Sequence, residues 1–154
     1  FATLDPTTRR LSLPQTSAAP KEVLMTDTVG FIRELPKPLL EAFRATLEET
    51  READLLLLVV DLADPDWQSQ LEAVHQLLDG LSCDQLRKVV ANQIDRCDAS
   101  AIDAIRTLEP DVIYLSATEG TGLKGLRNWL EKQFWDGAPT PEPFTQQTSF
   151  PDHG

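Results

Sequence analysis

Short apolar runs that each end at a polar residue recur along this chain and alternate with segments of helical periodicity. The runs are Glu22–Thr26 (EVLMT), Leu55–Val60 (LLLLVV), Lys88–Ala91 (KVVA) and Val112–Leu115 (VIYL). Their length and their leucine and β-branched content are typical of buried strands. A fifth run, Arg9–Leu13 (RRLSL), alternates between polar and apolar residues and predicts a partly exposed strand.

The segments between these runs carry apolar side chains at the spacing of an amphipathic helix. In one of them, Asp64 predicts the N-cap, Pro65 the first helical position and Gly80 the C-cap. Strands that alternate with amphipathic helices indicate βαβ units, and therefore an α/β fold with a mostly parallel sheet. The predicted helices occupy Pro36–Ala53, the segment from Asp64 to Gly80, a segment that follows Asp98, and a segment from Leu123 to Phe134.

The charge balance and the lack of long apolar runs exclude several classes of protein. The chain has 14 Lys and Arg against 25 Asp and Glu, a net charge of −11, so we expect no direct stand-alone binding to DNA. No apolar run approaches the roughly 20 residues that cross a bilayer, so we expect no membrane span. No signal or transit peptide is recognisable. Cys83 and Cys97 are too few for a disulfide framework and indicate free thiols in a reducing cytoplasm.

The chain is predicted to contain one domain, residues 1–136, followed by a disordered tail. The tail, residues 137–154, holds four prolines and has no apolar periodicity (GAPTPEPFTQQTSFPDHG). The sequence begins with Phe1, and its only methionine is Met25. We therefore expect the chain to be a fragment or a processed product.

Polar clusters follow three of the predicted strands, where ligands bind in a parallel α/β sheet. They are Asp27-Thr28-Val29-Gly30, Asn92-Gln93-Ile94-Asp95 and Ser116-Ala117-Thr118. A carboxylate at a strand end can hold Mg²⁺ through water, and a glycine three residues later lets a backbone N–H approach a phosphate. An aspartate can accept from the paired N–H donors of guanine, which adenine lacks. N–H groups of the Ser-Ala turn are expected to donate to the guanine carbonyl. Together, in this order, the clusters predict a guanine-nucleotide site.

Longer stretches of the chain resemble one protein family. FATLDPTTRR (Phe1–Arg10), TDTVGFIRELP (Thr26–Pro36) and EAFRATLEETREADLLLLVVD (Glu41–Asp61) are similar to the HflX family of ribosome-associated GTPases. The similarity extends through the guanine-reading segments to about Trp135. It implies a P-loop NTPase-like three-layer αβα sandwich with a mostly parallel sheet, here incomplete because the first strand and first helix are absent.

The resemblance also implies an activity and partners. It implies a cytoplasmic protein that binds GTP or GDP with Mg²⁺, hydrolyses GTP to GDP and phosphate, and associates with the large subunit of the ribosome. Thr3 matches the threonine that ligates Mg²⁺ and senses the γ-phosphate, and Asp27 matches the outer-shell Mg²⁺ partner. Phe31 stands where many signalling GTPases carry a water-orienting glutamine, so no catalytic side chain is assigned with certainty. The residues that match GTP-binding positions are Phe1, Ala2, Thr3, Leu4, Asp5, Asp27, Thr28, Val29, Gly30, Asn92, Gln93, Ile94, Asp95, Ser116, Ala117 and Thr118.

Two departures from the family pattern affect the expected activity. The phosphate-loop motif G-x-x-x-x-G-K-[ST] does not occur in these 154 residues, so we expect the chain alone to be inactive. Gln93 replaces the lysine usual in the guanine motif, which is expected to weaken nucleotide binding by about 1–2 kcal/mol. An alternative stays open: a catalytically dead GTPase remnant that serves as a protein-binding module, through the acidic segment Glu41–Asp54.

Overall fold

The structure is a computed structural model that describes residues 7–13, 21–28, 41, 47 and 49–135. The described residues form two compact units. The first comprises residues up to Ala53 together with those from Lys124 onward, and the second runs from Asp54 to Leu123. Each unit is described below by itself.

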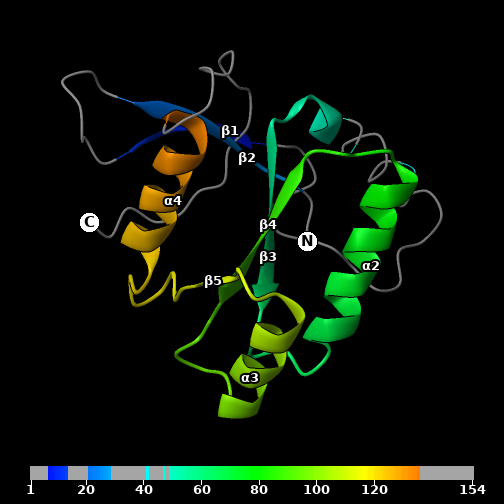
Figure 1. The fold of residues 1–154 in the computed structure, drawn as a ribbon, viewed down its shortest axis with the longest axis vertical. Helices are drawn as coiled ribbons and strands as arrows, with labels where there is room; N and C mark the ends of the chain where they lie inside the picture. The colour runs from blue at the N-terminus through cyan, green and yellow to red at the C-terminus, as the bar shows by residue number, and fades with distance from the viewer. Residues whose placement is uncertain (1–6, 14–20, 29–40, 42–46, 48, 136–154) are drawn as a thin grey trace. The chain divides into compact units, whose positions relative to one another are not determined.

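The second unit is built on a parallel three-stranded sheet in the order β3-β4-β5. Leu55 lies opposite Leu86, and Asp61 lies opposite Asn92, so β3 and β4 end at the same edge of the sheet. Figure 1 shows α2 running alongside these two strands. The elements of this unit are β3 (Leu55–Asp61), α2 (Trp67–Gly80), β4 (Leu86–Asn92), α3 (Ala99–Leu108) and β5 (Ile113–Tyr114).

Alternation along β3 defines the core of the second unit. Leu56, Leu58 and Val60 are buried, whereas Val59 is exposed. Because successive side chains of a strand point to opposite faces, the buried set lies on one face of the sheet. The helices contribute buried side chains of their own, among them Trp67, Leu71 and Leu78 of α2 and Ile105 of α3.

The first unit contains an antiparallel pair of strands and most of helix α4. Strand β1 (Thr7–Ser12) pairs with β2 (Glu22–Asp27), and the Leu13 N–H donates to the Lys21 carbonyl at 2.9 Å. Helix α4 (Leu123–Trp135) carries an acidic residue, Glu131, that is only 6% exposed. The Lys21 ammonium lies 3.4 Å from the Glu131 carboxylate and 5.5 Å from the centre of the Trp135 ring. This partly buried ion pair links the residue before β2 to α4.

The predicted strands and the α/β class are confirmed, and two helix-cap predictions are wrong. Helix α2 begins at Trp67, because the Asp64 carboxylate accepts from the Asp66 N–H at 2.8 Å and forms a separate turn before the helix. Asp66 therefore takes the N-cap position that was predicted for Asp64. The strand predicted over Val112–Leu115 is also shorter, since only two of its residues pair with β4.

The C-cap prediction at Gly80 fails for a local reason. Gly80 is the last residue of α2, and Leu81 takes the cap position. The positive φ that usually requires glycine falls on Ser82, at 55°. The Cys83 N–H then donates to the Leu78 carbonyl at 3.0 Å, which closes the end of the helix without glycine.

Some predictions fall on residues that the structure does not describe. The helix predicted over Pro36–Ala53 lies largely outside the described residues, and within it Glu49–Glu52 forms a 3-10 helix, η1. The tail predicted from residue 137 lies wholly outside them. In the described part of the chain, no helix is long and apolar enough to cross a membrane.

Candidate functional site

The carboxyl ends of β4 and β5 are joined by one side chain. Asn92 is the last residue of β4, and its Oδ1 accepts from the Gln93 N–H at 2.8 Å and from the Ala117 N–H at 3.0 Å. The Leu115 N–H donates to the Ala91 carbonyl at 2.8 Å just below this point. Asn92 thereby brings together two clusters that lie 25 residues apart in the sequence.

The turn after Asn92 has an unusual backbone conformation. Gln93 has a φ of 63°, a left-handed value that residues other than glycine and asparagine rarely adopt. The Arg96 N–H donates to the Gln93 carbonyl at 2.9 Å and closes the turn. Asp95 lies inside this turn and is exposed. The turn therefore presents a carboxylate to solvent beside the strand ends.

The second cluster lies in a tight loop from Ser116 to Gly122. Ser116 is 1% exposed; its N–H donates to the Thr121 carbonyl at 2.9 Å, and its Oγ accepts from the Glu119 N–H at 3.2 Å. Gly122 has a φ of 80°, and a Cβ at this position would overlap the Tyr114 backbone oxygen. Only glycine fits there, so the loop is held tightly against β5.

These hydrogen bonds correct one expectation about the Ser-Ala turn. The N–H groups of Ser116 and Ala117 were expected to face the guanine carbonyl, but both donate inside the protein, to Thr121 and Asn92. Thr118 is exposed and follows next in the turn. Thr118 is therefore the exposed residue of the three in this cluster.

Cys97 adds a thiol to the same turn. Its Sγ–H donates to the Ile94 carbonyl at 3.6 Å. Burial raises the pKa of the Cys97 thiol; the negative charges of Asp98 and Asp95 also raise it, and a backbone hydrogen bond partly opposes them. Both cysteines of the chain are free thiols, as predicted from their number.

The predicted magnesium position is described only in part. Asp27 ends β2 in the first unit, opposite Thr7, and Thr28 follows it. Phe1–Asp5, Val29 and Gly30 lie outside the described residues. A single carboxylate at a strand end fits a role as outer partner of Mg²⁺, which keeps several of its waters. Within the described ranges no group of three or more His, Cys, Asp and Glu side chains is placed to hold a metal ion.

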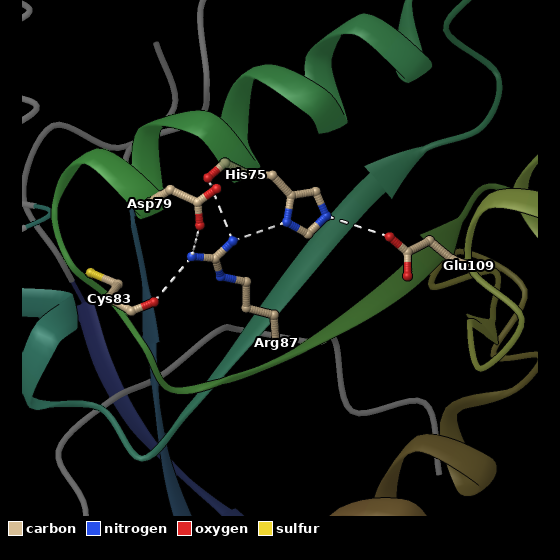
Figure 2. A network of polar contacts seen from close by, with 5 residues as sticks. All are labelled: His75, Asp79, Cys83, Arg87 and Glu109. Atoms are coloured by element: carbon tan, nitrogen blue, oxygen red, sulfur yellow. Dashed lines mark hydrogen bonds and ion pairs between the residues drawn. The ribbon is translucent and has the colours of Figure 1, made fainter.

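A second polar cluster, which the sequence did not predict, lies around Arg87 near the amino end of β4 (Figure 2). The Arg87 guanidinium donates to the Asp79 carboxylate at 2.7 Å, to the Cys83 carbonyl at 3.0 Å and to His75 Nδ1 at 3.2 Å. His75 Nε2 lies 3.4 Å from the Glu109 carboxylate. Since arginine only donates, Nδ1 of His75 must accept, which places the ring proton on Nε2, facing Glu109. The cluster ties α2, β4 and the end of α3 together.

Comparisons with known proteins identify the family of this chain. A family model described as "50S ribosome-binding GTPase" matches residues 1–93. The chain is 47% identical over 133 residues to the GTPase HflX of Lacrimispora saccharolytica and 44% identical over 133 residues to that of Magnetococcus marinus. These matches cover 85% and 86% of this chain but only 30% of each relative. The chain therefore spans about a third of the length of the curated relatives it matches.

A solved structure shows the same fold. It is Era in complex with MgGDPNP and nucleotides 1506–1542 of 16S ribosomal RNA, with a TM-score of 0.62 and 24% identity. The match covers 86% of this chain and 47% of that chain. The family match, the HflX relatives and the fold agree with one another. This chain belongs to the family of 50S ribosome-binding GTPases, and within it to the HflX proteins.

Proposed function

We propose that this chain supplies the guanine-reading part of a site that binds GTP and GDP. Asp95 accepts from the two N–H donors of guanine, and the Thr118 N–H donates to its carbonyl. Asn92, Gln93, Ile94, Ser116 and Ala117 shape the pocket around the base. What supports the proposal is the exposed carboxylate of Asp95 beside the ordered Ser116–Gly122 loop, together with the GTPase relatives.

One observation carries this proposal. The Asn92 carbonyl oxygen accepts from the backbone of both clusters, so the base-reading aspartate and the Ser-Ala turn are fixed to the same point. A base that inserts between them meets groups that are already in place, which reduces the entropy lost on binding. In this account Asn92 acts as a positioning residue and Asp95 as the selective one.

From the family resemblance we also propose a phosphate-binding role for the residues around Asp27. Thr3 and Asp27 would hold Mg²⁺, Thr3 directly and Asp27 through water, and the ion would neutralise charge on the phosphates. Phe1–Asp5 and Thr28–Gly30 would surround the phosphates, with the Gly30 N–H facing the terminal one. Because the sequence contains no G-x-x-x-x-G-K-[ST], we propose that residues outside this chain complete the phosphate site and that hydrolysis of GTP requires them.

The wider role is proposed from the family and the relatives. We propose that the whole protein hydrolyses GTP to GDP and phosphate in the cytoplasm and acts on the 50S ribosomal subunit. The family description and the name GTPase HflX support this role. The net charge of −11 leads us to place the contacts with ribosomal RNA outside this segment.

The test is titration calorimetry of the whole chain with GDP and Mg²⁺, with ATP as the competing nucleotide. We expect binding of GDP only, weakened roughly tenfold or more by Asp95→Ala because a charge-assisted hydrogen bond is lost. Asp98→Ala is the matched control, since Asp98 is exposed nearby but precedes α3. Equal binding of ATP and GDP would refute guanine reading.

Gln93 allows a gain-of-function version of the same test. Gln93→Lys restores the residue usual in the guanine motif and keeps the backbone, because the left-handed turn is held by the Asn92 side chain and the Arg96 N–H. The proposal predicts tighter GDP binding, by roughly tenfold, with selectivity over ATP unchanged. A substitution without any effect on affinity would show that Gln93 does not face the nucleotide.

A further inference from the structure

Helix α4 carries a basic face on a chain that is strongly acidic overall. Lys124, Asn128 and Lys132 are exposed, and their spacing of four residues places them in one line along the helix. Among the residues that the structure describes, none pairs with the ammonium group of Lys124 or of Lys132. The chain has a net charge of −11, so these two groups differ in sign from most of its charged side chains.

The acidic residue of α4 does not oppose this positive charge. Glu131 is buried, and its carboxylate lies 3.4 Å from the Lys21 ammonium. The negative charge of the helix is therefore neutralised on the side that packs against the protein. Lysines are the charged residues that α4 exposes, and its exposed residues are Lys124, Gly125, Asn128, Lys132 and Gln133.

Gly125 lies on the same face, and nothing inside the protein requires a glycine there. At 3.6 residues per turn, it falls within about 100° of the other three positions around the helix axis. Its backbone is helical, and a Cβ at this position would meet no atom within 4 Å. Glycine within a helix is destabilising relative to alanine, but it lets another molecule approach the backbone closely. Gly125 therefore leaves a shallow notch beside the two lysines.

We propose that the basic face of α4, formed by Lys124, Gly125, Asn128 and Lys132, binds an acidic α-helix of another protein. The two ammonium groups pair with carboxylates of that helix, the Asn128 amide donates to a third carboxylate, and the notch at Gly125 admits the partner. The two lysines lie about 12 Å apart along the axis, the rise of eight residues in an α-helix. Acidic residues spaced four and eight positions apart on the partner match this line.

An acidic helix fits this face better than a nucleic acid or an apolar surface. The phosphates of a nucleic acid form a continuous run of negative charge, which the 25 acidic residues of the chain repel. An acidic helix brings only a few carboxylates, and they lie opposite the lysines. An apolar partner would bury both ammonium groups without a counter-charge, which is costly.

The test is fluorescence anisotropy of a labelled, helix-stapled peptide that is titrated with the whole chain. One peptide carries glutamate at every fourth position, and the other carries glutamine at the same positions. We expect the glutamate peptide to bind with a dissociation constant on the order of 100 µM at low salt, and the glutamine peptide not to bind. Equal binding of the two peptides would overturn the proposal. So would the absence of binding at roughly 1 mM chain.

Variants with one positive charge less show whether this face is the binding surface. Lys124→Gln and Lys132→Gln should each weaken binding of the glutamate peptide roughly threefold, because each removes one exposed ion pair. Arg106→Gln is the matched control, since it removes one positive charge from an exposed residue of α3. The control should bind as the unchanged chain does. An equal loss in all three variants would show that net charge governs binding, and would overturn the proposal.

Gly125→Ala tests the close approach without damaging the fold. The added methyl group meets open space, so thermal unfolding should show equal or higher stability. Binding of the glutamate peptide should nevertheless weaken roughly threefold, because the methyl group fills the notch. Unchanged affinity would contradict the role of Gly125. A labelled RNA duplex should bind more weakly than the glutamate peptide, and tighter binding of the RNA would overturn the choice of an acidic helix.

Discussion

The two ends of β4 are both polar, but they are built in different ways. At the carboxyl end, the Asn92 side chain accepts from two backbone N–H groups, and Asp95 and Thr118 in the adjoining turns are exposed. At the amino end, the Arg87 guanidinium donates to the His75 ring, the Asp79 carboxylate and the Cys83 carbonyl. One end is organised around groups that face outward, and the other is closed on itself. Polarity at a strand end therefore indicates a site only where groups are left for a ligand.

The largest expected effect concerns Gly122, on the carboxyl-end loop. Gly122→Ala introduces a Cβ that overlaps the Tyr114 oxygen at a positive φ, so we expect a loss of roughly 2–4 kcal/mol in unfolding free energy. Urea unfolding of the variant and of the unchanged chain measures this difference in unfolding free energy. The control is Gly125→Ala, where a Cβ meets open space in α4 and should stabilise by up to about 1 kcal/mol. Equal effects of the two substitutions would contradict the tight loop.

The next largest effect concerns Asn92, which we expect to hold the two clusters in position and not to select the base. Asn92→Ala leaves the N–H groups of Gln93 and Ala117 without their acceptor, and we expect a loss of roughly 2–3 kcal/mol in stability. Asn92→Asp keeps an acceptor oxygen and should recover most of that loss. If thermal unfolding showed Asn92→Ala to be as stable as the unchanged chain, the joining of the two clusters would be unsupported.

A smaller effect is expected at the amino end of β4. Arg87→Met keeps the apolar stem but removes every hydrogen bond of the guanidinium, and we expect a loss of about 1–2 kcal/mol in stability. Arg87→Lys should not recover it, because an ammonium cannot reach Asp79, Cys83 and His75 at once. Neither variant should change the affinity for GDP, measured by calorimetry. A change in the affinity for GDP would contradict the view that only the carboxyl end of β4 binds the nucleotide.

The smallest effect concerns the Cys97 thiol. Because the pKa of Cys97 is raised, its thiolate forms at higher pH than that of a free cysteine. The rate of alkylation by iodoacetamide should therefore begin to increase at a higher pH than it does for a free cysteine. Asp95→Asn removes one of the charges that raise the pKa and should shift the profile toward lower pH. Asp103→Asn, on α3 beside Arg106, should leave it unchanged. Mass spectrometry of the alkylated peptide gives the rate.

The carboxyl end of β4 was predictable because its residues follow a strand in a recognisable pattern. Asn92 and Asp95 stand directly after an apolar run, and parallel strands bring their ends to one edge. The hydrogen-bond partners were not predictable, since the position of the Ala117 N–H depends on how β5 packs. The short length of β5 depends on the same packing.

The amino-end cluster could not have been found from the sequence. His75, Arg87 and Glu109 are separated by 12 and 22 residues and follow no periodic pattern. The N-cap of α2 shows that sequence is also ambiguous over a few residues. Both Asp64 and Asp66 are suitable N-cap residues, and the turn that Asp64 forms with the Asp66 N–H leaves Asp66 as the N-cap. Residue types at strand ends are visible in sequence, whereas the choice among equivalent polar partners is made by tertiary geometry.

The central claim is that the carboxyl end of β4 reads guanine, and amide NMR shifts test it most directly. Millimolar GDP is added to the labelled whole chain, and ADP is added to a second sample; this detects weak binding without the missing phosphate loop. The account predicts shifts confined to the Asn92–Cys97 turn and the Ser116–Thr118 turn, with GDP and not with ADP. No shift in either turn, or the same shifts with both nucleotides, would contradict it.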